Sequence, residues 1–362
     1  MENEFEYKIV EDTIIIEKCP GDKMTKEIRK KSKVFTDRIK KIHLCEGIKE
    51  IGEGTFSGCS FNTIILPNTL KNIENYAFCN CTNIKEIYIP EGVQQIGAGA
   101  FGNCYFLEKI VIPDTVEQIE EKTFVNCVEL KDICMPNSIH TIGISAFKNC
   151  NSLKEINLPK SLKYLGKDVF RDCNSLNEVV IPEGVEQLER TFFDCLGLTK
   201  VVLPTSLKII GKQTFNNCNR LSNIEFKEGL EVIGEKAFSC CFNLVNVDLP
   251  KSLKTIGETS FAQTGIMNIN IPDSVSTVGV NAFWGCEDLE EVIIGKGVKV
   301  IESAAFKECD SLYNVSFKGN VERIGKDSFY GCFSLENISL PRGLKKIEKR
   351  LFFECDQKKS RK

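Results

Sequence analysis

The sequence predicts a repeat solenoid of the α/β class, rich in strand: a stack of about 14 coils of about 22–23 residues with a parallel sheet along one side. Two observations predict this class. One apolar frame, as in Val93 to Pro113, recurs along almost the whole chain and restarts at Val116. Single columns of Phe and of Cys also run through that frame. A chain of 362 residues would otherwise suggest two or three globular domains of roughly 150 residues.

Every coil opens on a large aliphatic residue. These residues are Ile48, Leu70, Val93, Val116, Ile139, Leu162, Val185, Leu207, Leu230, Leu253, Val275, Val298, Val321 and Leu344. The coils that begin at Ile48, Val185 and Leu253 are one residue short, and the loss falls in a predicted turn each time. The coil length therefore varies in the turns, whereas the spacing of the apolar residues is kept. This is expected of a solenoid, in which each coil packs only on its neighbours.

The first expected element of a coil is a short strand before a proline, such as residues 87–89 before Pro90. Its alternation predicts two buried side chains and one that faces outward. Proline has no N–H and a fixed φ, so it ends the strand at the same height in each coil that carries it. A second extended piece follows at Val-x-x-Ile, and then a turn that holds Gly or Glu. Because Glu rarely accepts a positive φ, we expect ordinary turn backbone there.

Each coil next contributes one residue to the Phe column, which runs from Phe56 to Phe352. Neighbouring strands lie about 4.8 Å apart, so the sequence predicts a stack of buried rings. Thirteen of the 18 cysteines form the Cys column, from Cys59 to Cys355, where Thr264 replaces one of them. One Cys per coil without His is poor geometry for zinc, so we expect buried free thiols. Disulfides between neighbouring coils remain the alternative.

The pattern Cys-x-x-Leu-x-x-Ile-x-Leu-Pro-x-x-Val-x-x-Ile-Gly-x-x-Ala-Phe resembles the BspA-like class of leucine-rich repeats over residues 39–355. The resemblance implies a curved, right-handed leucine-rich repeat solenoid with a parallel sheet on its concave side. It also implies kinship with surface proteins of bacteria and parasitic protists, several of which are adhesins. Surface members carry a secretion signal, whereas the N-terminus from Met1 to Glu6 is acidic and lacks the basic and apolar regions of one.

Two segments lie outside the repeats: an N-terminal cap at residues 1–38 and a polar tail at residues 356–362. In the cap we expect a strand over Tyr7–Glu17, a turn at Cys19–Asp22 and a short helix over Lys23–Phe35. The segment from Lys23 to Lys41 has nine basic and two acidic residues. It could contact an anionic partner or membrane surface; the alternative is a solvated face of the cap.

Composition argues against several functions. With 47 Lys+Arg, 50 Asp+Glu and a net charge of −3, the chain lacks the basic surface of a nucleic-acid binder. No stretch approaches the ~18 apolar residues of a membrane span. The string Gly97–Gly102 matches the G-x-G-x-x-G motif of dinucleotide-binding sites. It is part of the frame that all coils share, so we do not expect a nucleotide site there. The two histidines, His43 and His140, stand about four coils apart, so we expect no enzyme activity, cofactor or metal.

The outward positions of the expected strands form the candidate binding surface. They are mostly apolar from Ile65 to Val202 and polar, rich in Asn, from Asn223 to Asn337. An apolar stripe rimmed by charge is typical of a protein-binding surface, although β-branched residues also favour any exposed strand. The Asn-rich half is interpreted as a stacked amide ladder or, alternatively, as a ligand-reading surface. The candidate contact residues are Ile65, Tyr88, Val111, Val180 and Val202, with Glu86, Lys109, Asp132 and Glu178 setting the polarity.

The sequence therefore predicts a non-catalytic module that binds a protein partner on the concave sheet. The alternative, which rests on the resemblance, is a cell-surface adhesin for host matrix proteins or glycans. Reduced thiols and the absence of a secretion signal lead us to expect a cytoplasmic location. A location at the cell surface, or secretion by a non-classical route, is the alternative.

Overall fold

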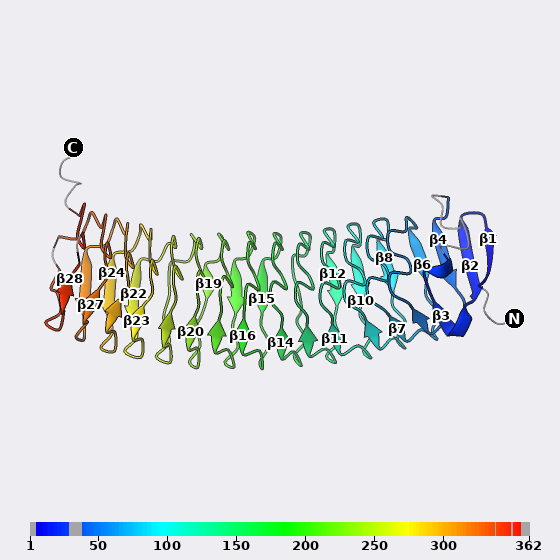
Figure 1. Ribbon diagram of the computed structural model, residues 1–362, viewed down its shortest axis with the longest axis horizontal. Helices are drawn as coiled ribbons and strands as arrows, with labels where there is room; N and C mark the ends of the chain where they lie inside the picture. The colour runs from blue at the N-terminus through cyan, green and yellow to red at the C-terminus, as the bar shows by residue number, and fades with distance from the viewer. Residues whose placement is uncertain (1–4, 29–37, 337, 349, 356–362) are drawn as a thin grey trace. The chain divides into compact units, whose positions relative to one another are not determined.

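A computed structural model describes residues 5–28, 38–336, 338–348 and 350–355. The chain divides into two compact units, Met1–Pro182 and Glu183–Lys362, and each is described by itself. In both units the coils stack on one another and join through short parallel strands, so the predicted solenoid is confirmed (Figure 1). Each coil contributes to two columns of strands. We call the strands at the Ile-x-Leu position of the frame, which a proline follows in most coils, the front strands, and those of the Val-x-x-Ile pieces the rear strands.

The first unit begins with β1 (Glu6–Val10) and the 3-10 turn η1 (Pro20–Asp22). Its front strands are β2 (Thr13–Lys18), β4 (Lys41–Leu44), β6 (Thr63–Ile65), β8 (Glu86–Tyr88), β10 (Lys109–Val111), β12 (Asp132–Cys134) and β15 (Glu178–Val180). Its rear strands are β3 (Lys23–Met24), β5 (Glu50–Ile51), β7 (Asn72–Ile73), β9 (Gln95–Ile96), β11 (Gln118–Ile119), β13 (Thr141–Ile142) and β14 (Tyr164–Leu165).

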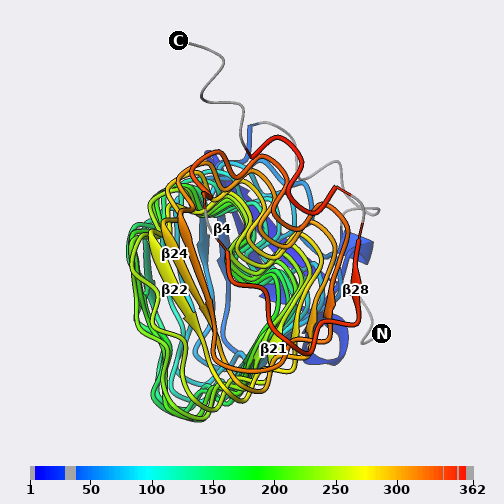
Figure 2. The same ribbon diagram turned by 90° about the vertical axis from the view of Figure 1, so that its left-hand side faces the viewer.

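The second unit repeats this plan. Its front strands are β17 (Lys200–Val202), β19 (Asn223–Ile224), β22 (Asn268–Ile271), β24 (Glu291–Ile294) and β26 (Asn314–Phe317). Its rear strands are β16 (Gln187–Leu188), β18 (Ile209–Ile210), β20 (Val232–Ile233), β21 (Thr255–Ile256), β23 (Thr277–Val278), β25 (Val300–Ile301), β27 (Arg323–Ile324) and β28 (Lys346–Ile347). Figure 2 shows β22 and β24 on one side of the coil and β21 and β28 on the other.

Prolines end the front strands by starting a turn. The carbonyl of Pro90 accepts a hydrogen bond from the N–H of Val93 at 3.0 Å, and Pro113 does the same with Val116 at 3.1 Å. This bond spans three residues, as in a β-turn, and it turns the chain from the front strand toward the rear strand. The strands end before these prolines as predicted, but the same bond forms at Lys227 and Gly295, so the turn itself does not require proline.

The core of each coil is the Phe ring and the Cys thiol. In the first unit, successive rings from Phe56 to Phe170 have centroids 5.3–5.8 Å apart and lie nearly parallel. All 18 cysteines are free, so the disulfide alternative finds no support. Instead, most thiols of the Cys column donate to the Phe carbonyl of the preceding coil, as where Cys104 Sγ donates to Phe78 O at 3.2 Å. The thiols therefore link the coils by weak hydrogen bonds.

The cap differs from its prediction. The expected strand over 7–17 is a hairpin in which β1 pairs antiparallel with β2 through a turn at Glu11. The expected helix over Lys23–Phe35 is wrong at its start, because Lys23 and Met24 form β3 and pair in parallel with β5. Burial of the Met24 side chain and this ladder outweigh the local charge pattern. Helical backbone is present at 27–28, and the rest of that segment, like the tail 356–362, lies outside the described residues.

Candidate protein-binding face

The front strands of the first unit present the predicted apolar column to solvent. Tyr88 is 63% exposed, Val180 61% and Ile65 54%, whereas Ile87 and Ile110 beside them are buried. The strand pleat produces this difference, because successive side chains point to opposite faces. In the ladder of β8, β10 and β12, Tyr88 pairs with Val111, and Val111 pairs with Cys134. The structure thus places three of the exposed side chains on adjacent strands.

The predicted charged residues flank this column. Lys109 and Asp132 are partners in register on β10 and β12, and Lys109 Nζ lies 3.2 Å from Asp132 Oδ2. The hydrogen bond to Asp132 raises the pKa of Lys109 above its ordinary value. Glu86 is paired in register with Lys109 on its other side. Charges of both signs therefore flank the column, and the Lys109–Asp132 pair has no net charge.

A second row of charges runs beside the first. Glu108 Oε1 and Oε2 lie 3.4 Å and 3.0 Å from the ammonium groups of Lys85 and Lys131 respectively. The hydrogen bond from Lys131 is the larger cause, and that from Lys85 the smaller, of a lowered pKa at Glu108. Two lysines share one carboxylate, so this edge of the face has a net positive charge.

A hollow beside the column was missed by the sequence reasoning. It has a volume of about 720 Å³ and is lined by Asn62, Thr63, Asn83, Lys85, Glu86 and Phe106. Phe106 is 53% exposed. The signal was present in the sequence, because Tyr105 and Phe106 stand where later coils carry Asn and Ser, for example at 151–152. A large exposed aromatic in a turn next to a binding surface is a candidate anchor.

Not every predicted contact residue belongs to this face. Val202 lies on β17 of the second unit and is 40% exposed. Glu178 and Val180 lie on β15, which connects to the preceding coil only by the single bridge between Glu155 and Glu178. The continuous ladder of described residues is therefore β8, β10 and β12, with β6 as its neighbour in sequence.

The basic segment from Lys23 to Lys41 is described only in part. Lys23 Nζ lies 3.4 Å from Glu50 Oε2 and contacts Glu74 Oε1, so this ammonium is already neutralised within the fold. Residues 29–37 lie outside the described residues. An anionic partner for the segment stays a prediction.

A second hollow of the first unit lies on its rear strands. It has a volume of about 820 Å³, and its lining includes Glu74, Asp114, Glu117, Glu120 and His140. The imidazole Nδ1 of His140 lies 3.3 Å from the carbonyl oxygen of Ser138. His43 lies instead on the front strand β4, so the two histidines are on different columns, in agreement with the prediction that they do not share a site.

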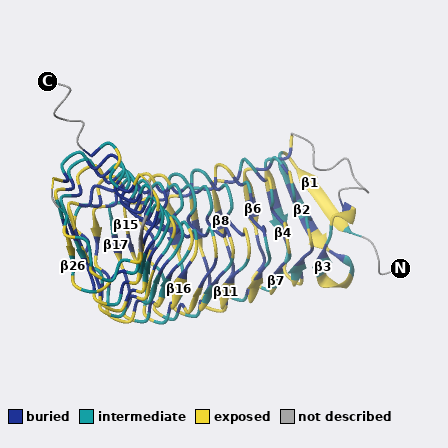
Figure 3. Ribbon diagram, turned by 60° about the vertical axis from the view of Figure 1, so that its left-hand side comes forward, coloured by how far each residue is buried: buried dark blue, intermediate teal, exposed yellow. Residues whose placement is uncertain are grey.

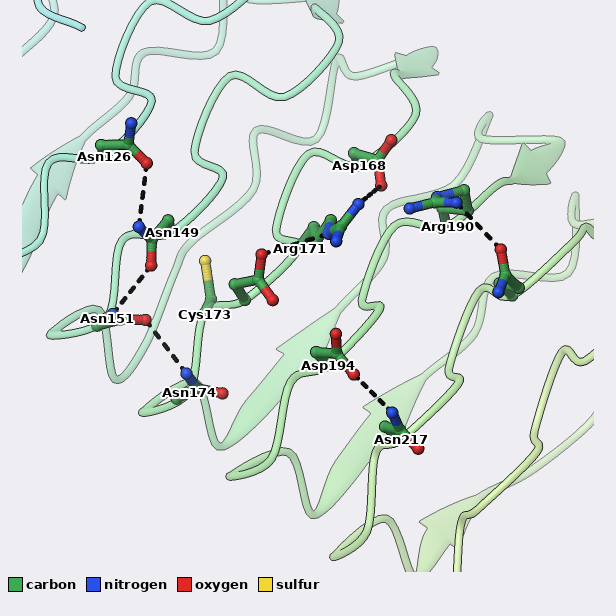
Figure 4. A network of polar contacts seen from close by, with 12 residues as sticks. Asn126, Asn149, Asn151, Asp168, Arg171, Cys173, Asn174, Arg190, Asp194 and Asn217 are labelled. Carbon is green, nitrogen blue, oxygen red and sulfur yellow. Dashed lines mark hydrogen bonds and ion pairs between the residues drawn. The ribbon is translucent and has the colours of Figure 1, made fainter. Parts of the chain in front are cut away.

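Amide ladders are present, but not where the sequence analysis put them. Asn149 Nδ2 donates to Asn126 Oδ1 at 3.0 Å (Figure 4). Asn126 Nδ2 in turn donates to Asn103 Oδ1. In the second unit, Asn217 Nδ2 donates to Asp194 Oδ1 at 2.7 Å. These residues directly precede the cysteines and lie outside the front strands. On the described front strands of the second unit, the side chain of Asn314 donates to Glu291, and none of the hydrogen bonds joins two of the outward Asn side chains.

Two further features concern the described part of the chain alone. No helix there has the length and apolar character needed to cross a lipid bilayer. No group of three or more His, Cys, Asp or Glu side chains there is arranged to hold a metal ion.

Comparison with known proteins agrees with this architecture. A family described as BspA type leucine rich repeat region, in six copies, matches residues 22–131, 96–196, 188–313 and 254–361. No curated protein sequence matches the chain. A solved leucine-rich repeat protein from Bacteroides ovatus is similar at 28% identity with a TM-score of 0.63, over 95% of this chain and 83% of that one.

Two other solved structures are more distant. A leucine-rich repeat protein from Eubacterium ventriosum is 20% identical with a TM-score of 0.50, over 97% of this chain and 92% of that one. A leucine rich cell surface protein from Faecalibacterium prausnitzii is 22% identical with a TM-score of 0.48, over 87% of this chain and 93% of that one. The first of these shows a shared fold.

Proposed function

The chain belongs to the BspA-type leucine-rich repeat family, and on that premise we propose that it is a non-catalytic module that binds a protein partner on front strands of its first unit. The observation that carries the proposal is the exposed column of Tyr88, Val111 and Cys134 on adjacent strands, beside the hollow lined by Phe106. Soluble proteins rarely leave a contiguous apolar patch rimmed by charge without a use for it.

The residues present suit a protein surface better than a small molecule. Tyr88 and Phe106 supply aromatic area, and aromatic side chains dominate the binding energy of protein interfaces. Lys85, Lys131 and Glu86 surround them with charges that would orient a partner and remain solvated at the rim. The hollow is open to solvent, so a protruding side chain of the partner is a better occupant than an enclosed ligand.

The test is capture of partners from the native cell by the full chain and by a variant that carries Tyr88→Asp and Val111→Asp, two neighbours in the column. We expect binding to weaken at least about 100-fold, because two apolar anchors that become buried in the complex are replaced by carboxylates that would have to be desolvated. The matched control carries Tyr76→Asp and Ile144→Asp, which alter exposed apolar residues in turns of the same unit. A folded Tyr88/Val111 variant that still captures its partner would rule out this face.

Cys134 offers a second measurement without mutation. Its side chain is exposed at one end of the column, next to Val111. A bound partner should slow alkylation of Cys134 at least about tenfold, since the thiol becomes buried. Alkylation at an unchanged rate in the saturated complex would contradict the proposed site.

We also propose a cytoplasmic location, which the column of buried free thiols supports. Fractionation of the native cell tests it directly. Recovery of the protein at the cell surface, together with binding to matrix proteins or glycans through the same residues, would favour the adhesin alternative.

A further inference from the structure

Strand β1 is the edge strand of the front sheet at the N-terminal end of the first unit. The strand order is β1-β2-β4-β6, so β1 has one paired edge and one that no described residue pairs. All five of its residues are exposed, including Tyr7 at 40% and Ile9 at 50% (Figure 3). An exposed apolar edge strand is a template for pairing with another chain.

The free edge has a defined pattern of backbone groups. A two-residue turn joins Val10 to Thr13, so these two residues form the hydrogen-bonded pair next to the turn. Hydrogen-bonded and non-hydrogen-bonded pairs alternate along an antiparallel ladder. The N–H and C=O of Lys8, two residues before Val10, therefore also point toward β2. The N–H and C=O of Tyr7 and Ile9 therefore point outward, away from β2.

The side chains of the same two residues continue the inner face of the fold. Tyr7 pairs with Ile16 and Ile9 pairs with Ile14, and both of these partners are fully buried. Residues that pair directly across a ladder share one face of the sheet. The apolar face of the core thus runs out to β1, where no described residue covers it.

We propose that β1 pairs antiparallel with β1 of a second copy of this chain, about a two-fold axis at Tyr7. In this register Tyr7 lies opposite the partner's Tyr7, in a pair whose outward N–H and C=O groups bond each other. Ile9 lies opposite the partner's Phe5, which extends the apolar face across the junction. The front sheets of two first units then form one continuous sheet.

Charge selects a second copy as the occupant and fixes the register. With the axis at Tyr7, Lys8 lies opposite the partner's Glu6, and the reverse pair forms on the other side of the axis. Within each hairpin, Lys8 Nζ lies 2.5 Å from Glu17 Oε1, and Lys18 Nζ lies 3.7 Å from Glu6 Oε1. In the dimer these residues form a row of charges of alternating sign. The row runs from Glu17 to Lys8, then to the partner's Glu6 and the partner's Lys18. An axis at Lys8 would instead oppose two lysines, which is unfavourable.

Charge reversal on the full chain tests the proposal by sedimentation analysis over about 1–100 µM, the range expected of a small interface. The unaltered chain should dimerise. Glu6→Lys and Lys8→Glu should each weaken the dimer at least about tenfold, because both cross-strand pairs become repulsive. The chain that carries both changes should dimerise again. An equimolar mixture of the two single variants should form a heterodimer.

Each of these charges is exposed, so the single changes should leave folding intact, which circular dichroism and thermal unfolding verify. Ile9→Pro is an independent variant, because it removes an outward N–H and leaves the ladder to β2 in place. It should give a folded monomer. A chain that is monomeric throughout the range, or a dimer indifferent to charge reversal and to Ile9→Pro, would overturn the proposal.

Discussion

At the scale of single residues, the coils depend on two positions with a positive φ. The first lies three residues after the rear strand, as at Lys122 (φ 57°) and Thr259 (φ 54°). The second directly precedes the cysteine, as at Asn103 (φ 60°) and Asn126 (φ 59°). Asn, Asp and Gly, which tolerate this region, occupy most of the second column. The first column contains many residues that do not tolerate it, so its turns are strained.

Thr259 is the clearest case, because a β-branched residue strongly disfavours a positive φ. Thr259→Gly should stabilise the second unit by about 0.5–1 kcal/mol, the gain from relieved strain less the entropy that glycine adds to the unfolded chain. Urea unfolding measures the change. The control is Thr255→Gly in the rear strand β21, which should destabilise by a similar amount. A variant at 259 that is as unstable as the control would contradict the account.

Sequence reasoning identified neither of these two positions. It predicted that the Gly that follows the rear strand does not need a positive φ, and Gly97 and Gly257 confirm this. These glycines instead allow close stacking, since a Cβ at Gly257 would lie 2.6 Å from the carbonyl carbon of Gly234. The first positive-φ column could not be predicted, because its residue types do not show the preference of its backbone.

At the scale of elements, the alternation and the prolines predicted where strands lie, but not which strands pair. β6 pairs with β4 and β8 pairs with β10, yet no ladder of described residues joins β6 to β8. The interruption lies at the shortened coil that begins at Ile48, and the hollow lined by Phe106 opens beside it. In this coil the turn after the cysteine is one residue short, and its strand is in register with one neighbour only.

The second unit behaves in the same way. Two of its coils are shortened. In the one that begins at Leu253, the front strand β22 pairs with β24 but not with residues 246–248 before it. A smaller hollow of about 310 Å³, lined by Val245, Gly265 and Met267 among others, lies there. The coils that begin at Ile48 and Leu253, which lose a residue after the cysteine position, thus each have a hollow beside them, whereas the front strand β17 of the shortened coil that begins at Val185 is paired on both sides. Sequence reasoning found the apolar column but missed the hollow, because the residue pattern does not show how a shortened turn displaces its strand.

Because coils pack only on their neighbours, one complete coil should be removable. Deletion of residues 298–320 joins Gly297 to Val321, so that Phe283 can stack on Phe329 as Phe306 does now. We expect a folded chain whose calorimetric enthalpy of unfolding falls by about 16 kcal/mol, in proportion to the residues removed. Deletion of 298–309, half a coil, is the control and should abolish cooperative unfolding. Loss of the transition in both would show that the coils are not interchangeable.

At the scale of the whole molecule, the Cys column couples stability to pH. Burial raises the pKa of Cys173 to about 12 and that of Cys286 to about 11, from 9.0 for an unperturbed thiol. The folded chain therefore keeps these protons at a pH where the unfolded chain has lost them. Above about pH 9 the unfolded state binds fewer protons, and stability must fall as pH rises. Below about pH 8 both states are protonated, and these thiols contribute no pH dependence.

Between its unfolded and folded pKa values, each such thiol lowers the free energy of unfolding by up to about 1.4 kcal/mol per pH unit. The urea midpoint, measured with a reductant, should be flat from pH 7 to 8 and drop steeply from pH 9 to 10.5. Replacing Cys173 and Cys286 by Thr, the residue that occupies this column at Thr264, should remove about 2.8 kcal/mol per pH unit from the slope. Cys134→Ser, at an exposed position, should leave the slope unchanged. Equal slopes in the Thr variant and the unaltered chain would show that the column does not set the alkaline limit of the fold.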